Sequence, residues 1–238
     1  MNTDTRERFA RAEIASIPVR SRSRTASVDV GCAFFAAATV TGGTVLLSNL
    51  PEQIPVGAAI FLEVLAEMGA YVVDAPDGMS VTTRSTAGEL RGVDADVSGC
   101  PELVPLLLVA ASIARSPSVF RGVPAAPPVV HLLRAAGADV DHSDSRVRMT
   151  PAPLHGIRWD APSSAGAFAG LLLGLAVEQM VVDVSPVDRE HPGALAEWTR
   201  ILHADEYLLP GSARLPHDFL RGPAREKAPH DNRSGGRE

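Results

Sequence analysis

Three uncharged segments of the chain predict three buried helices. Residues 33–40 and 165–177 are almost entirely apolar, and residues 103–114 carry no charge and only one polar side chain, Ser112. A surface helix has a polar face, so a helix that is apolar all round is buried on every side. At about 1.5 Å per residue the middle segment spans roughly 18 Å, which is too short to cross a bilayer. We therefore predict core helices and no membrane partner.

The elements that follow each buried helix repeat along the chain. A strand-like segment and then an amphipathic helix come next in all three units: residues 44–47 and 58–68, 118–121 and 129–136, and 180–184 and 194–202. In the first two units another strand follows, at residues 79–83 and 146–150. Because an internal repeat is stronger evidence for architecture than local propensity, we predict one α/β (α+β) domain of three similar units.

This repeat sets the expected domain boundaries. The domain covers residues 17–205, with units at about residues 17–85, 86–150 and 151–205. Residues 1–16 are charged, and we expect a flexible N-terminus there. Residues 206–238 are rich in Pro, Gly, Arg and charge, and we expect a disordered tail.

Composition narrows the classes of function. The 238 residues include 22 Lys and Arg and 28 Asp and Glu, which gives a formal net charge of −6. This balance gives no reason to expect nucleic acid as a partner. The 2 cysteines do not make a disulfide framework in a chain of this length. Residues 1–11 lack the apolar stretch of a secretory signal, so we expect a cytoplasmic protein.

The sequence carries none of the common cofactor motifs. It has no glycine-rich dinucleotide loop, no phosphate-binding P-loop, no zinc-ligand spacing and no nucleophile elbow. We therefore expect no cofactor. Two acids alternate along residues 93–97, where a metal site is the alternative to a solvated strand face, and we expect no metal there.

A candidate binding site follows from the geometry of the repeat instead. Three parallel repeats bring three buried helices together, and we expect their N-terminal ends to share one surface. Helix N-termini offer N–H donors and positive potential, which suit a phosphate or a carboxylate. Asp29, Glu102, Ser163 and Ser164 stand at these ends. The two serines are either helix caps or ligand contacts.

Several segments together resemble the EPSP synthase (3-phosphoshikimate 1-carboxyvinyltransferase) family. They match its C-terminal half in order and spacing: Pro101-Glu102 before residues 103–114, residues 35–38 before 41–45, and residues 62–70, 133–138 and 174–177. The resemblance implies one of the family's two domains, an inside-out barrel of three βαβαββ units around three buried helices. The family enzyme joins phosphoenolpyruvate to shikimate 3-phosphate between its two domains. It is nearly twice as long, and its other domain has no counterpart in this chain.

The resemblance assigns roles to a few residues. The family acid that acts as a base at the start of the middle buried helix corresponds to Glu102. The family lysine near the end of the third unit falls near Arg189, which keeps the charge but stays protonated. The family's Asp-His-Arg falls on residues 163–165, its phosphate-gripping segment on residues 124–128, and only Gly57 is left of its Gln-Gly-Asp. One lost donor can cost on the order of 3 kcal/mol of catalysis, so these losses disfavour ordinary EPSP synthase chemistry.

Three functions remain open at this point. The first is a repurposed enzyme of specialised metabolism that acts on a shikimate-like or other cyclic small molecule by acid/base elimination or rearrangement. The second is a non-catalytic protein, either a homodimer or a partner subunit of a separate N-terminal half. The third is enolpyruvyl transfer with unusual residues. For the first, our prediction, the catalytic residues are Glu102 and Arg189, the substrate contacts are Asp29, Cys100, Ser163 and Ser164, and Cys32 is a further neighbour of Glu102.

Overall fold

The computed structural model describes most of the predicted domain. The described residues are 9–12, 20–23, 28–48, 51, 53–75, 78–83, 90–125 and 127–202. The predicted tail at residues 206–238 and most of the predicted N-terminal segment lie outside these residues.

The first unit consists of two helices and a four-stranded sheet. Its elements are β2 (Arg20–Ser23), α2 (Val28–Thr41), β3 (Thr44–Leu47), α3 (Val56–Met68), β4 (Tyr71–Ala75) and β5 (Gly78–Thr82). The strand order is β2-β3-β5-β4. Strand β2 runs parallel to β3, and β5 runs antiparallel to both β3 and β4. The hairpin β4–β5 therefore returns the chain beside β3 and completes the sheet.

The second unit has the same order of elements. They are β6 (Asp94–Asp96), α4 (Val104–Ser112), β7 (Ser118–Arg121), α5 (Pro128–Ala135), β8 (Asp139–Ser143) and β9 (Arg146–Thr150). The strand order β6-β7-β9-β8 and the parallel and antiparallel pairings match those of the first unit. The element order βαβαββ thus occurs twice in succession.

The third unit has a sheet of three described strands. Its elements are β10 (Arg158–Trp159), α6 (Ser164–Gly174), β11 (Met180–Asp183), α7 (Ser185–Glu190) and α8 (Ala194–Leu202). Strand β1 (Phe9–Ala12) pairs antiparallel with β11, where β5 and β9 pair with β3 and β7 in the other units. Residues 9–12 therefore form a sheet strand, whereas the sequence analysis assigned them to a flexible N-terminus. Pairing with β11, far away in sequence, explains the difference.

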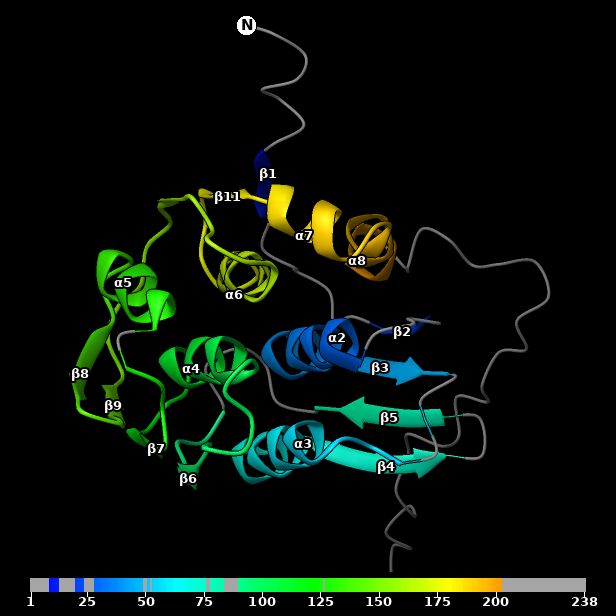
Figure 1. The fold of residues 1–238 in the computed structure, drawn as a ribbon, viewed down its shortest axis with the longest axis horizontal. Helices are drawn as coiled ribbons and strands as arrows, with labels where there is room; N and C mark the ends of the chain where they lie inside the picture. The colour runs from blue at the N-terminus through cyan, green and yellow to red at the C-terminus, as the bar shows by residue number, and fades with distance from the viewer. Residues whose placement is uncertain are drawn as a thin grey trace, which may run out of the picture. The chain divides into compact units, whose positions relative to one another are not determined.

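The three apolar helices form the centre of the core. Helices α2, α4 and α6 contact one another pairwise, and Figure 1 shows them side by side between the sheets. Nearly all of their residues are buried, as their lack of a polar face requires. The described strands form three separate sheets, none of which closes on itself. Within the described residues, no helix has the length and apolar character that a membrane span needs.

Candidate functional site

The structure gathers most of the predicted site residues into two groups. The Glu102 group, near the starts of α2, α3 and α4, contains Asp29, Cys32, Cys100 and Glu102. The Ser164 group, at the start of α6, contains Ser163, Ser164 and Glu190. Among the described residues, no hydrogen bond or ion pair joins one group to the other.

Glu102 lies in a short connection between β6 and α4, residues 97–102, which we call the 97–102 turn. Just before it, Oδ1 of Asp96 accepts a hydrogen bond from the backbone nitrogen of Ser98 at 2.9 Å. The backbone nitrogen of Cys100 donates to the carbonyl oxygen of Val97 at 3.0 Å. An aspartate that accepts from the backbone two residues ahead stabilises a turn. The backbone that carries Glu102 is therefore fixed by local hydrogen bonds.

Asp96 keeps its negative charge beside this turn. Hydrogen bonds from the Ser98 backbone and side chain lower the pKa of Asp96 from its ordinary value, and the nearby Arg121 guanidinium lowers it further. Arg121 also forms an ion pair with Asp94. The charge of Arg121 thus acts on both carboxylates of β6.

Two glycines allow the 97–102 turn to pack against the first turns of α3. A Cβ atom on Gly57 would lie 3.2 Å from Oε1 of Glu102 and 3.1 Å from the backbone oxygen of Gly99. A Cβ atom on Gly99 would lie 2.5 Å from Cδ1 of Ile60, one turn further along α3. A side chain at either glycine would therefore require these neighbouring atoms to shift.

The carboxylate of Glu102 is exposed and stands at the N-terminal turn of α3. The helix has Pro55 at its N-cap, and no side chain caps it. Negative charge is favourable at a helix N-terminus. Within the described residues, Glu102 has no hydrogen-bond or ion-pair partner, so its carboxylate is available to a ligand.

The Glu102 group also contains two buried thiols, those of Cys32 and Cys100. Burial raises the pKa of Cys32 far above its ordinary value, and the charges of Asp29, Cys100 and Glu102 raise it further. Burial and then the charges of Glu102 and Asp96 raise the pKa of Cys100 to about 11. Both thiols are therefore protonated at neutral pH. A protonated thiol is neither a nucleophile nor a good metal ligand.

The described residues contain no candidate metal site. No group of three or more His, Cys, Asp or Glu side chains within them is arranged to hold an ion.

Cys100, which the sequence analysis assigned to the substrate, is buried, and its Sγ donates to the carbonyl oxygen of Val97 at 3.6 Å. Cys100 is therefore part of the 97–102 turn, and its thiol bonds within that turn.

Cys32 also lines an apolar pocket between α2, α3 and the first sheet. Its lining is apolar: Val28, Cys32, Phe35, Leu47, Pro51, Ile54, Ala58, Leu62 and Met79. Val28 belongs to the first turn of α2, which also carries Asp29, and Cys32 follows one turn later. The pocket is lined mostly by buried core side chains, so it is part of the packing between α2, α3 and the first sheet.

The Ser164 group has its polar atoms paired within the protein. Oγ of Ser163 accepts a hydrogen bond from the backbone nitrogen of Gly166 at 3.2 Å, so Ser163 is the N-cap of α6. Oγ of Ser164 donates to Oε2 of Glu190, the last residue of α7, at 2.5 Å. A carboxylate of the protein itself thus lies where the sequence analysis placed an anionic ligand. Nothing in the sequence pairs Ser164 with Glu190, because their contact depends on how α7 packs on α6.

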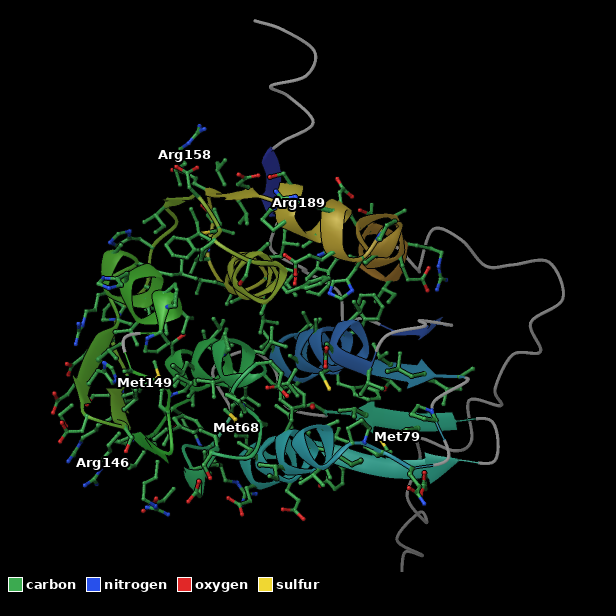
Figure 2. The ribbon with its side chains drawn as sticks, in the orientation of Figure 1. Met68, Met79, Arg146, Met149, Arg158 and Arg189 are labelled. Atoms are coloured by element: carbon green, nitrogen blue, oxygen red, sulfur yellow. The ribbon has the colours of Figure 1, made fainter. Side chains whose placement is uncertain are left out.

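Arg189 is exposed on α7, away from the Glu102 group. Figure 2 shows it near the top of the view, whereas α3 and α4, which flank Glu102, lie lower. No ion pair or hydrogen bond among the described residues connects Arg189 with Glu102. The structure therefore does not bring the two predicted catalytic residues together.

Comparison with known proteins identifies the domain type. Residues 30–127 match the family model for EPSP synthase (3-phosphoshikimate 1-carboxyvinyltransferase). The chain is 33% identical over 177 residues to the 3-phosphoshikimate 1-carboxyvinyltransferase of Methanoculleus marisnigri, covering 67% of this chain and 39% of that protein. The resemblance to the EPSP synthase family is confirmed. The enzyme of the same name from Nostoc punctiforme is 34% identical over 129 residues, which cover 51% of this EPSP synthase-like chain and 30% of that protein.

Solved structures show the same fold. The enolpyruvyl transferase NikO from Streptomyces tendae superimposes with a TM-score of 0.60 at 19% identity, covering 74% of this chain and 43% of that one. EPSP synthase from Acinetobacter baumannii gives a TM-score of 0.59 at 16% identity, with 74% and 46% covered. The mixed α/β fold of the enolpyruvyl transferases is thus present here. The chain spans less than half of the length of each of these relatives.

Proposed function

We propose that this EPSP synthase-like chain binds a shikimate-like or other cyclic hydroxylated acid at the Glu102 group and acts on it by acid/base chemistry. The observation that carries the proposal is the exposed Glu102 carboxylate, which lies at the N-terminal turn of α3 without a partner among the described residues. A carboxylate placed within reach of a substrate proton is a suitable general base. The thiols of Cys32 and Cys100 behind it are buried and protonated, so they add no further charge to the site.

The reaction class that fits one base is elimination or rearrangement. Glu102 would take a proton from a ring carbon and, as the carboxylic acid, return it to a hydroxyl on the neighbouring carbon, which would leave as water while the double bond forms. Such a step needs no phosphate clamp. The Glu102 group and its turn carry the carboxylates of Asp29, Asp96 and Glu102. Like charges disfavour a phosphate group, which carries nearly two negative charges at neutral pH, more than they disfavour a singly charged carboxylate.

Enolpyruvyl transfer is the second candidate, because it is the activity named for the curated relatives. It predicts binding of phosphoenolpyruvate as well as a shikimate-type ligand. A non-catalytic role as a homodimer or as a partner subunit is the third candidate. We also propose that the three units form the family's inside-out barrel, with β1 completing the third unit. The repeated sheet order of the first two units supports this arrangement.

Ligand-dependent thermal unfolding tests these candidates. A ligand that binds only the native state raises its stability by RT ln(1 + [L]/Kd). We expect shikimate or a related cyclic acid to raise Tm, phosphoenolpyruvate to have no effect, and Glu102→Gln to abolish the shift. Glu178→Gln, at an exposed glutamate after α6, is the matched control and should keep the shift. The compound that binds should then lose one water on incubation with the protein, as seen by mass spectrometry.

Other results would select another function. Stabilisation by phosphoenolpyruvate together with shikimate 3-phosphate would favour enolpyruvyl transfer. No shift with any compound, together with a dimeric mass in analytical ultracentrifugation, would favour the non-catalytic interpretation. A shift that survives Glu102→Gln would contradict the placement of the site.

A further inference from the structure

Gly57 has no side chain, so atoms of the 97–102 turn, including the Glu102 carboxylate, can lie close to its Cα. A Cβ atom there would lie 3.1 Å from the Gly99 oxygen, 3.2 Å from Oε1 of Glu102 and 3.5 Å from Cβ of Cys100. Contacts of 3.0–3.4 Å are tighter than nine in ten real Cβ contacts. Any side chain at this position would therefore displace the 97–102 turn, the carboxylate, or both.

The backbone of Gly57 does not itself require glycine. Gly57 is the second residue of α3, and its φ lies outside the left-handed region in which glycine is favoured. Within a helix, alanine is the better residue, because glycine loses more conformational freedom on folding. The free space over the first turn of α3 is thus what glycine provides at this position.

We propose that Gly57 is a positioning residue for Glu102. It lets the 97–102 turn approach α3, and this approach sets the place of the Glu102 carboxylate relative to α2 and α4. The inference rests on the proposed function, in which Glu102 is the general base. An added methyl group would press on the carboxylate, which can swing away, and on the Gly99 oxygen, which belongs to the backbone of the same turn. Both responses move the base.

The chain offers a matched control at the start of another helix. A Cβ atom on Gly166, in the first turn of α6, would lie 3.2 Å from Cδ of Pro162 and 3.5 Å from Oγ of Ser163. These clearances resemble those at Gly57, but none of them involves Glu102. Gly166→Ala therefore introduces the same methyl group in the same kind of helix position, away from the proposed base.

A double-mutant cycle on the free protein separates positioning from general packing. Thermal unfolding would be measured for Gly57→Ala and Gly166→Ala, each alone and combined with Glu102→Ala. If Gly57 makes room for the carboxylate, Gly57→Ala should lower Tm less in the Glu102→Ala background than in the wild type. Gly166→Ala should have the same effect in both backgrounds. An equal loss for Gly57→Ala in both backgrounds would assign the whole cost to the Gly99 oxygen and would overturn the claim that Gly57 makes room for the carboxylate.

Turnover of the bound ligand is a second measurement. A packing change that leaves Glu102 in place would not alter it. With the cyclic acid that stabilises the wild type, Gly57→Ala should reduce turnover by at least about tenfold, since small displacements of a reacting group are costly. Gly166→Ala should leave turnover unchanged, and equal turnover in the two variants would overturn the inference. If no compound binds the wild type, the proposed function fails, while the cycle still decides whether Gly57 positions Glu102. If Gly57→Ala alone does not fold, its rescue by Glu102→Ala supports the inference, and failure of rescue contradicts it.

Discussion

The Glu102 group and the Ser164 group lie at the N-terminal ends of two similar buried helices, α4 and α6, but differ in how their polar atoms are paired. At α6, Ser163 caps the helix and Ser164 donates to Glu190 at 2.5 Å. At α4, no side chain caps the helix, and Glu102 has no partner among the described residues. Equivalent places in a repeated fold can thus be structural in one unit and available to a ligand in another.

The largest expected difference between the groups concerns alkaline pH. The pKa of Cys100 is about 11 in the folded protein, against an ordinary value of 9.0. Because the unfolded chain loses this proton first, stability is full below about pH 9 and falls as pH rises toward the folded pKa. The loss should be on the order of 2 kcal/mol, measured by urea unfolding at pH 8 and pH 11. Cys100→Ser, which keeps a donor but does not ionise, should remove this part of the loss.

Charge changes in the two groups should affect this alkaline loss differently. The Glu102 carboxylate helps to raise the pKa of Cys100, so Glu102→Gln should reduce the loss between pH 8 and pH 11. Glu190→Gln, in the Ser164 group, should leave it unchanged. The same alkaline loss in the wild type and in Cys100→Ser would show that the thiol does not titrate as expected.

The next largest effect tests the contact between α6 and α7. Ser164→Ala removes the donor to Glu190, and the free energy of unfolding should fall by about 1.5 kcal/mol, as for a hydrogen bond to a charged group. Equilibrium urea unfolding at pH 7 measures this change. Ser164→Ala should leave ligand-induced stabilisation at the Glu102 group intact. Loss of that stabilisation would show that the two groups form one site.

The N-cap of α6 should contribute less. Ser163→Ala leaves the backbone nitrogen of Gly166 without its acceptor and should lower stability by about 1 kcal/mol. Ser163→Asn, which keeps a capping oxygen, should restore most of it. Urea unfolding of both variants checks this expectation. Equal losses in the two variants would mean that packing, and not capping, accounts for the effect.

The sequence predicted the regular elements where patterning and packing agree. The strands predicted at residues 44–47, 118–121 and 146–150 and the helix at 194–202 have those bounds in the structure. The α/β fold of the family is also confirmed. Elements that depend on distant partners were missed. Strand β1 forms only against β11. Strand β8 was missed for another reason: it reads Asp-Val-Asp-His-Ser, a mostly polar sequence, and is held by its hairpin pairing with β9.

The candidate site was predictable only in part. The predicted helix N-termini pointed to Asp29, Glu102 and the two serines as site residues. The structure places Asp29 near Glu102. The roles of the serines depend on partners that periodicity does not show, such as Glu190 on α7, a helix that the sequence analysis missed because it is short and charged. The glycine at the second position of α3, Gly57, could have indicated a close contact at this helix start, because alanine is the stronger helix former.

The smallest expected effect concerns the turn that carries Glu102. Hydrogen bonds from Ser98 lower the pKa of Asp96 in the folded protein. A carboxyl group with a lowered pKa stabilises the fold above its unfolded pKa, and this contribution is lost as pH falls through the folded pKa. Asp96→Asn should therefore weaken the acid-side decline in Tm, with little change at pH 7 because an asparagine oxygen can still accept from Ser98. Asp188→Asn, an exposed change on α7, should leave the acid decline as it is. An unchanged acid decline in Asp96→Asn would show that the turn is held by packing on α3 and not by this carboxylate.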